Sequence, residues 1–258
     1  MAMTTDPEEV GEVLYEAYLD RRPLDSAQLS ALTAADGYKA QQEFIDRRLS
    51  TEGPVVGYKI GFTNETVQAD LGVSEPSYGQ VLSETVREER QFSVDELCAP
   101  RIEPEIAFVL GESLGESASR LDVLAATECV VPVIEVVDSR IENWELTGAT
   151  AIADNSLAAR LLPGERVAST ETALHLESVE LLIDGERRAT GTGAAVLGHP
   201  ADAVAWLASK LPDHGDSLQA GDIVTTGSLT EPIPVTAGQT VVARFGSLGT
   251  VVAHAAEK

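Results

Sequence analysis

The stretches RIEPEIAFVL (Arg101–Leu110) and CVVPVIEVVD (Cys129–Asp138) decide the fold, because each is an apolar run that carries glutamates. Runs of this length that are rich in Val and Ile indicate buried strands. The Asp184-Gly185 pair predicts a tight hairpin, and the C-terminal third predicts a β-roll or barrel-like sandwich. Further apolar runs of this kind are VVGYKIGF (55–62), SVELLIDGERR (178–188), GDIVTTGS (221–228), QTVVARFG (239–246) and GTVVAHA (249–255).

The N-terminal region has a helical pattern instead. Apolar residues recur at three- and four-residue spacing over residues 6–50, Thr33 with Asp36 predicts a helix start, and Gly53-Pro54 ends the region. We therefore expect an α+β protein in two parts, a small helical segment (1–52) and a mixed, β-rich, metal-binding catalytic domain (53–258).

Two more helices are predicted inside the β-rich part. SRLDVLAATE (119–128) begins with Ser119 and Asp122 at the spacing of a capping box. ADAVAWLASKL (201–211) follows His199-Pro200, where a capping role is the simplest interpretation of the histidine.

Acidic residues dominate the charge of the chain. Forty-two Asp and Glu face 18 Lys and Arg, for a net charge of −24. Such a surface repels nucleic acids and anionic membranes, so neither is an expected partner. Only four of the basic residues are lysines. An acidic, lysine-poor surface is typical of proteins held in molar salt, which screens self-repulsion, so we expect a halophilic source.

The location in the cell follows from what the chain lacks. No apolar run approaches the ~20 residues of a membrane helix, and the first residues, MAMTTDPEEV, do not resemble a signal peptide. Cys98 and Cys129 match no disulfide framework or zinc motif and are expected to be buried thiols. We therefore predict a cytoplasmic protein.

Glu103, Glu105 and Glu135 are the candidate metal ligands. Glu103 and Glu105 are two apart on a predicted strand and project to one face, while Glu135 interrupts an otherwise apolar strand. Converging carboxylates need a cation, and all-oxygen ligation favours Mg²⁺ or Mn²⁺. Two simpler explanations stay open: a solvated strand edge beside Pro104, and an ion pair between Glu135 and Arg140.

Lys59 is the candidate catalytic group. It lies between Gly57 and Gly61 in an apolar run of a chain that has little lysine. A lysine in such surroundings can act as an acid or base or hold a carboxylate, although a structural lysine remains the alternative. The four histidines are scattered, and the chain has neither a G-x-S-x-G elbow nor a phosphate-binding loop.

Several segments together resemble the 2-keto-4-pentenoate hydratase / 4-oxalocrotonate decarboxylase family of the fumarylacetoacetate hydrolase superfamily. The similarity spans roughly residues 10–255, with the motifs in family order. The segments are GYKIGFT (57–63), LGVSEPSYG (71–79), RIEPEIAFVL (101–110), VPVIEVVDSRIENW (131–144), IADN (152–155), GHP (198–200) and TGSLT (226–230).

The resemblance implies a β-roll of the fumarylacetoacetate hydrolase type and a lyase of aromatic catabolism that works on a small 2-oxo or 2-hydroxydienoic acid. It implies a homo-oligomer, which can associate with a related decarboxylase or hydratase. It also implies Mg²⁺ or Mn²⁺ as the cofactor and a proton-shuttling lysine. The implied residues are Glu103, Glu105 and Glu135 for the metal, Lys59 for catalysis, and Ser77, Asp138, Arg140 and Ser228 for the substrate.

One position departs from the family. Many hydratases have Pro-Asp where this chain has Pro76-Ser77, so an acid that handles water or a proton is missing. The leading hypothesis is a hydratase, and the first alternative is a 4-oxalocrotonate decarboxylase, which needs no activated water. A C–C hydrolase or oxaloacetate decarboxylase comes third, because hydrolases of the superfamily use an N-terminal His–Glu pair and the first histidine here is His175. The intact Lys59 and glutamates argue against a non-catalytic partner subunit.

Overall fold

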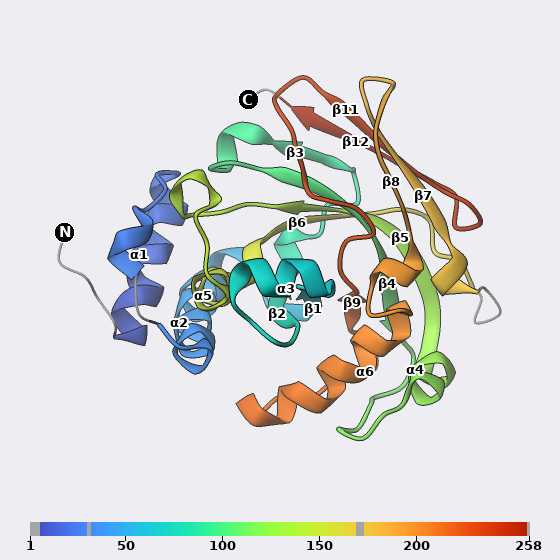
Figure 1. The fold of residues 1–258 in the computed structure, drawn as a ribbon, viewed down its shortest axis with the longest axis horizontal. Coiled ribbons are helices and arrows are strands. Elements are labelled where there is room, and N and C mark those ends of the chain that lie inside the picture. Colours follow the sequence, from blue (N-terminus) through green and yellow to red (C-terminus); the bar gives the residue numbers. More distant parts are fainter. Residues whose placement is uncertain (1–5, 30–31, 169–172, 257–258) are drawn as a thin grey trace.

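A curled main sheet carries the fold, and a second sheet packs against its convex side (Figure 1). The computed structural model describes residues 6–29, 32–168 and 173–256. The main sheet has the strand order β2-β1-β9-β4-β5-β6, with β10 paired to β4. Its strands are β1 (Val55–Gly61), β2 (Ser77–Leu82), β4 (Arg101–Leu110), β5 (Thr127–Val137), β6 (Ala158–Pro163), β9 (Ile223–Thr225) and β10 (Ile233–Pro234).

The curl brings the two edges of the main sheet towards each other. Val86, just beyond β2, forms a bridge with Leu161 of β6, and the Arg87 N–H donates to the Leu161 carbonyl at 2.7 Å. The sheet is therefore a half-barrel with an inner, concave face.

The second sheet is antiparallel except at one edge and has the order β3-β12-β11-β7-β8. The predicted Asp184-Gly185 hairpin is confirmed: both residues have positive φ, 52° and 81°, as a tight turn of this kind requires. The strands are β3 (Gln91–Ser93), β7 (Ser178–Ile183), β8 (Glu186–Thr192), β11 (Thr240–Phe245) and β12 (Thr250–Ala256).

Strand alternation divides the residues of β4 and β5 between two environments. Ile102, Ile106, Phe108, Ile134 and Val136 belong to the large core shared with the second sheet. Their neighbours along each strand point to the concave face, where a smaller apolar cluster gathers around Ala107, Val131 and Val133. The concave face therefore has an apolar floor on which a few polar groups stand out.

Six α-helices surround the sheets in the described ranges, and η marks short 3₁₀ helices. The α-helices are α1 (Pro7–Asp20), α2 (Ala34–Glu52), α3 (Glu65–Leu71), α4 (Arg120–Ala126), α5 (Gly148–Ala153) and α6 (Pro200–Lys210). The 3₁₀ helices are η1 (Ser26–Leu29), η2 (Ser83–Thr85), η3 (Val94–Glu96), η4 (Glu142–Trp144), η5 (Asn155–Leu157), η6 (Leu174–Leu176), η7 (Gly193–Ala195) and η8 (Leu211–His214). No helix in the described ranges is long and apolar enough to span a bilayer.

The predicted helix starts are confirmed. Thr33 with Asp36 caps α2, and Ser119 with Asp122 caps α4, each as a reciprocal capping box. His199 caps α6, where its ring Nδ1 accepts the Ala201 N–H at 3.1 Å.

The helical region predicted over residues 6–50 consists of two helices in the described residues, α1 and α2, with the second beginning at the predicted start. α1 ends at Asp20, and the next residue, Arg21, adopts a left-handed conformation with φ 53°. Pro23 follows, and it cannot supply the backbone N–H that a continuing helix needs. Between α1 and α2 the described residues contain the turn η1 and a bridge from Leu24 to Ile141, and the two helices form a hairpin.

The N-terminal helices are joined to the main sheet by buried hydrogen bonds. Gln41 of α2 donates from its side-chain amide to the carbonyls of Tyr78 in β2 and Ile152 in α5, at 2.9 and 2.8 Å. Two distant segments that flank the concave face are thereby held to one helix.

Candidate metal centre

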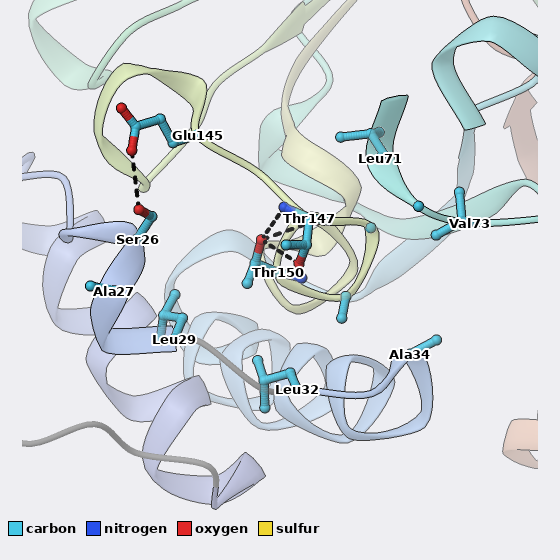
Figure 2. A pocket seen from close by; sticks show the side chains of 13 residues that line it. Ser26, Ala27, Leu29, Leu32, Ala34, Leu71, Val73, Glu145, Thr147 and Thr150 are labelled. Carbon is cyan, nitrogen blue, oxygen red and sulfur yellow. Dashed lines mark hydrogen bonds between the residues drawn. The ribbon is translucent and has the colours of Figure 1, made fainter. Parts of the chain in front are cut away.

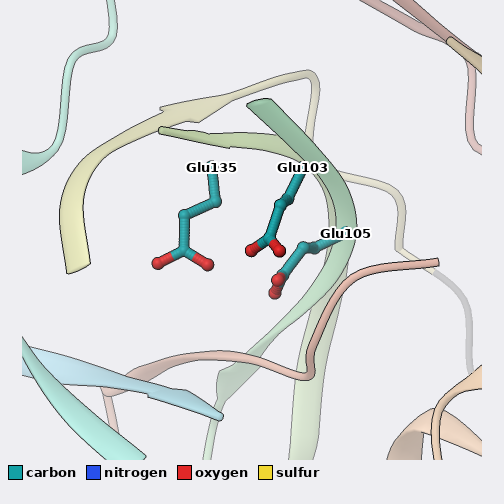
Figure 3. Close-up of side chains that lie close together, drawn as sticks. All are labelled: Glu103, Glu105 and Glu135. Carbon is teal, nitrogen blue, oxygen red and sulfur yellow. The ribbon is translucent and has the colours of Figure 1, made fainter. Parts of the chain in front are cut away.

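Glu103, Glu105 and Glu135 lie together on the concave face. In the β4–β5 register Glu103 is directly opposite Glu135, and Glu105 projects to the same side because it is two residues further along β4. Figure 3 shows the three carboxylates converging inside the curl of the sheet. One oxygen from each lies within 4.8 Å of those of the other two. The predicted cluster is therefore present in space.

The glutamates are poorly supplied with hydrogen-bond donors. Glu105 and Glu135 are buried, and Glu103 is partly buried. Glu105 Oε2 accepts the Gly227 N–H at 2.9 Å, whereas its Oε1 has no hydrogen-bond partner among the described residues. Gly227 has φ 104°, and a Cβ there would lie 2.5 Å from the Thr63 hydroxyl, so this donor position requires glycine.

Burial raises the pKa of all three carboxylic acids. The pKa of Glu103 rises to about 7, since burial and the charge of Glu135 outweigh the lowering effect of Lys59 and Arg101. The pKa of Glu105 is held well above its usual value by burial and by the other two glutamates. The pKa of Glu135 is also raised by burial, against the effect of Lys59. The carboxylates therefore need a further positive charge to ionise together.

Lys59 lies at the edge of the cluster. It is buried on β1, its Nζ lies 3.3 Å from Glu135 Oε2, and it donates to the Ser156 carbonyl at 2.9 Å. Burial lowers the pKa of this amine, but the three glutamates outweigh that effect and raise it. The simplest alternative for Glu135 was an ion pair with Arg140. That alternative is wrong, because Glu135 pairs with Lys59.

The donor set fits a hard divalent cation. Three carboxylates against one ammonium leave two negative charges in a largely buried site, and a divalent ion balances that charge. Oxygen ligands of this kind suit Mg²⁺, Mn²⁺ or Ca²⁺ and are poor ligands for softer ions. The unpartnered Glu105 Oε1 is the kind of buried oxygen that such an ion would satisfy.

Ser77 lies beside this cluster, and its hydroxyl is hydrogen-bonded to that of Ser156. In the β1–β2 register Ser77 is opposite Gly61, two residues beyond Lys59, so Ser77 shares the concave face. Its hydroxyl is buried and lies 3.0 Å from Ser156 Oγ, which also lies 2.8 Å from the Tyr78 carbonyl. Sequence reasoning missed Ser156, since it follows the quoted IADN segment with no pattern of its own.

Ser156 sits in a strained turn. Asn155, Ser156 and Leu157 have φ values of 53°, 47° and 68°, a left-handed run of three residues that are not glycine. Asn155 holds the turn to β2 by accepting the Gln80 N–H at 2.8 Å and donating to the Gln80 carbonyl at 2.9 Å. Strain of this kind persists only where the surroundings enforce it, and here it turns the Ser156 carbonyl towards Lys59.

Asp138 and Arg140 bind protein groups. The Asp138 carboxylate accepts the N–H groups of Cys98 and Ala99, the latter at 2.6 Å. The buried Arg140 guanidinium binds the Asp154 carboxylate, and its Nη2 donates to the Asp154 carbonyl at 2.8 Å. These contacts hold together the chain segments that follow β5 and α5. The prediction that both residues bind substrate stays a prediction.

Ser228 and the two cysteines are the remaining residues for which the sequence made a prediction. Ser228 is partly buried next to Gly227, and its hydroxyl accepts the Thr230 N–H at 3.3 Å. Its role in substrate binding stays a prediction. Cys129 is buried as expected, while Cys98 is only partly buried, and both are free thiols.

A separate hollow opens beside the N-terminal helices (Figure 2). It has a volume of about 400 Å³ and is lined by residues of η1, α2, α3 and α5. None of its lining residues belongs to the glutamate cluster or to the Lys59 surroundings. We therefore do not assign the hollow to the metal centre.

Comparison with known proteins places these observations in a family. The model of the fumarylacetoacetate hydrolase C-terminal domain matches residues 81–255. The chain is 36% identical over 226 residues to 4-oxalocrotonate decarboxylase of Pseudomonas sp. strain CF600, covering 86% of each chain. It is 36% identical over 252 residues to 2-keto-4-pentenoate hydratase 2 of Dechloromonas aromatica strain RCB, covering 96% of each.

A solved relative has nearly the same fold. The structure of 4-oxalocrotonate decarboxylase from Pseudomonas putida G7, in complex with magnesium and adipate, aligns with a TM-score of 0.91 at 31% identity. The alignment covers 98% of this chain and 99% of that one. A second structure of that enzyme, with calcium and acetate, aligns with a TM-score of 0.89.

Proposed function

The chain belongs to the fumarylacetoacetate hydrolase family, and from this premise we propose that it is a metal-dependent hydratase acting on a 2-hydroxy-2,4-dienoate. The product is a 4-hydroxy-2-oxo acid, and the reaction belongs to the catabolism of aromatic compounds. The similar proteins are hydratases and decarboxylases, so the chain is a lyase. The observation that carries the proposal is the convergence of Glu103, Glu105 and Glu135 beside Lys59.

The three glutamates hold the divalent ion, for which we propose Mg²⁺ or Mn²⁺. When bound, the ion supplies positive charge to the substrate carboxylate and 2-oxygen and stabilises the negative charge that develops there. Glu105 is positioned for this role by the Gly227 N–H, and Glu135 is positioned by its place opposite Glu103.

Lys59 moves the protons. Its Nζ is held by the Ser156 carbonyl and Glu135, so the ammonium has a fixed direction. Lys59 gives a proton to C5 of the dienol while the proton of the 2-hydroxyl leaves for solvent, which yields a 2-oxo-3-enoate. Water then adds at C4 and a proton is delivered to C3. Solvent finally returns one proton to Lys59, which balances the proton lost at the start.

A decarboxylase is the second candidate, and one residue favours it. Ser77 is a neutral hydroxyl next to Lys59, so this side of the site offers no carboxylate base for water. Loss of CO₂ from 4-oxalocrotonate needs an electron sink at the 2-oxygen and no added water.

We further propose that the chain forms a homo-oligomer and can associate with a related decarboxylase or hydratase.

The deciding experiment follows the absorbance of 2-hydroxypenta-2,4-dienoate in molar KCl with Mg²⁺. Metal-dependent loss of the dienol with formation of 4-hydroxy-2-oxopentanoate supports the hydratase, and EDTA is the control. Without turnover by a folded, metal-loaded protein, the hydratase proposal fails. CO₂ release from 4-oxalocrotonate is then the measurement that decides for the decarboxylase.

A further inference from the structure

Arg101 carries a positive charge on the face of the metal centre. It lies on β4 two residues before Glu103, with no register shift between them, so both side chains project to the concave side. Its charge is close enough to Glu103 to lower the pKa of that carboxylic acid. Among the described residues, however, no carboxylate lies within 4 Å of the Arg101 guanidinium and no group accepts a hydrogen bond from it.

The buried arginines of the described ranges differ from Arg101, because each has an acidic partner. The pairs are Arg48 with Glu52, Arg140 with Asp154, and Arg160 with Glu96. The chain has 42 acidic residues, so acids are not scarce. The concave face therefore keeps one guanidinium without a counter-ion from the described part of the chain.

Trp144 fixes the direction of this guanidinium. The central carbon of the Arg101 guanidinium lies 4.0 Å from the centre of the Trp144 ring, a cation–π contact. The indole N–H donates to the Ala99 carbonyl at 3.1 Å. Asn143 and Trp144 both have left-handed backbones, with φ 55° and 59°, and such strain persists only where the surroundings enforce it. The indole covers one face of the guanidinium and leaves its N–H edge for a ligand.

Apolar side chains lie between the metal centre and Arg101. Val137 is opposite Arg101 on β5 and belongs to an apolar cluster with Leu157, against which Phe62 and Trp144 pack. Phe62 directly follows β1, the strand of the catalytic lysine. Phe62, Trp144 and Arg101 are each partly exposed, so a ligand can reach them from solvent. This side of the site therefore offers an apolar surface that ends in a positive charge.

We propose that Arg101 binds a second carboxylate of the substrate, at the end of the carbon chain remote from the 2-oxygen. The protein is then selective for 2-hydroxydienoic or 2-oxo acids that are dicarboxylic. This rests on the proposed function, which sets the first carboxylate at the glutamate cluster. A guanidinium binds a carboxylate through two parallel N–H···O bonds. Two residues of strand separate Arg101 from Glu103 by about 7 Å, a distance that a short carbon chain spans.

Two 2-oxo acids test the inference by binding alone. 2-Oxoadipate and 2-oxohexanoate have carbon chains of equal length, but only the first ends in a second carboxylate. In calorimetry with the Mg²⁺-loaded protein, we expect 2-oxoadipate to bind about tenfold more tightly or better. Equal affinity for the two acids overturns the inference.

Variants of Arg101 assign the preference to this residue. Arg101→Met keeps an apolar chain over Trp144, and we expect it to lower the affinity for 2-oxoadipate about 10- to 100-fold without changing that for 2-oxohexanoate. Arg101→Lys keeps the charge but not the paired N–H groups, so it should retain only part of the preference. Arg187→Met, at an arginine with a side chain 66% exposed on the second sheet, is the matched control and should bind both acids as the wild type does.

The contrary results separate a binding role from a structural one. An equal loss of affinity for both acids in Arg101→Met overturns the inference. If that variant does not fold, Arg101→Lys decides: a reduced preference for 2-oxoadipate supports the inference, and an undiminished one overturns it. A crystal structure with Mg²⁺ and 2-oxoadipate should show the remote carboxylate on Arg101, and a carboxylate bound elsewhere overturns the inference. A protein that binds 2-oxoadipate through Arg101 but hydrates no 2-hydroxydienoate refutes the proposed function alone.

Discussion

Glu103 and Glu135 face each other across neighbouring antiparallel strands, with their carboxylates on the same side of the sheet. Like charges directly opposite each other in this way destabilise a sheet unless something neutralises them. The pair is therefore a cost to the metal-free protein, and a bound cation converts it into a stabilising contact.

Replacing Glu105 by Gln should separate metal binding from folding. The amide oxygen can still accept the Gly227 N–H, but one of the three carboxylate ligands is lost. We expect Mg²⁺ affinity to fall by more than about 100-fold, with loss of turnover and of the rise in Tm that Mg²⁺ causes. Calorimetry and thermal melts measure this. Glu128→Gln, an exposed change on the same sheet, is the control, and an active, metal-binding Glu105→Gln enzyme would refute the site.

Lys59→Met should lower turnover but, unlike Glu105→Gln, leave metal binding in place. The apolar chain fills the buried space, but no proton can be carried and Glu135 loses its partner. We expect kcat to fall by about 10²–10⁴ while Mg²⁺ still binds. Lys39→Met, at a lysine with a side chain 70% exposed, is the control for lysine loss. An unchanged kcat would remove Lys59 from the mechanism.

Metal affinity should depend on pH near neutrality. Burial raises the pKa of Glu103 to about 7 in the metal-free protein, so a proton occupies this ligand at lower pH and must leave when the ion binds. The sign follows: affinity falls as pH drops through about 7. Calorimetry in two buffers with different protonation enthalpies should detect proton release. Equal affinity and no release on both sides of this pH would contradict the assignment.

Buried and exposed ion pairs should differ in their effect on stability. Asp154→Ala removes the carboxylate that pairs with the fully buried Arg140 and leaves, among the described carboxylates, only Asp138 as its ion-pair partner, 3.8 Å away. We expect the free energy of unfolding to fall by about 3–5 kcal/mol. Asp202→Ala breaks the more exposed pair with Arg120 and should cost about 1 kcal/mol or less. Urea unfolding measures both, and similar losses would show that the buried network is not structural.

The net charge of −24 makes stability depend on salt. At about 1 M KCl the screening length is roughly 3 Å, so repulsion among surface carboxylates is largely removed. If the source is halophilic, Tm should rise by several degrees between dilute buffer and molar KCl, at ~2–4 °C for each kcal/mol gained. Sucrose at matched osmolality is the control for solvent exclusion. A Tm that falls or stays level in KCl would argue against halophily.

Much of the architecture was predictable, because long apolar runs and helix caps are local signals. β4 and β5, the hairpin at Asp184-Gly185 and the caps at Thr33 and Ser119 all follow from short patterns. SYGQVL and AARLLP were missed as strands, because neither alternates nor is rich in β-branched residues. They become strands by pairing with β1 and β5.

The site was predictable in composition but not in arrangement. Spacing placed Glu103 and Glu105 on one face, but the register that sets Glu135 opposite Glu103 depends on how two separate strands meet. Lys59 reaches the cluster from β1, which is joined to β4 only through β9. The role of Ser156 could not be predicted from the sequence, because its carbonyl points to Lys59 only when the backbone is left-handed.

The alternation of β4 has one further consequence, for how the protein reaches its native state. If β4 shifted by one residue against β5, its glutamates would exchange places with Ile102 and Pro104 and enter the dry core between the sheets. No cation could reach them there, so only the correctly paired hairpin can be captured by metal. The native pairing of β4 with β5 is therefore a condition for metal binding, because only this register brings the three carboxylates together.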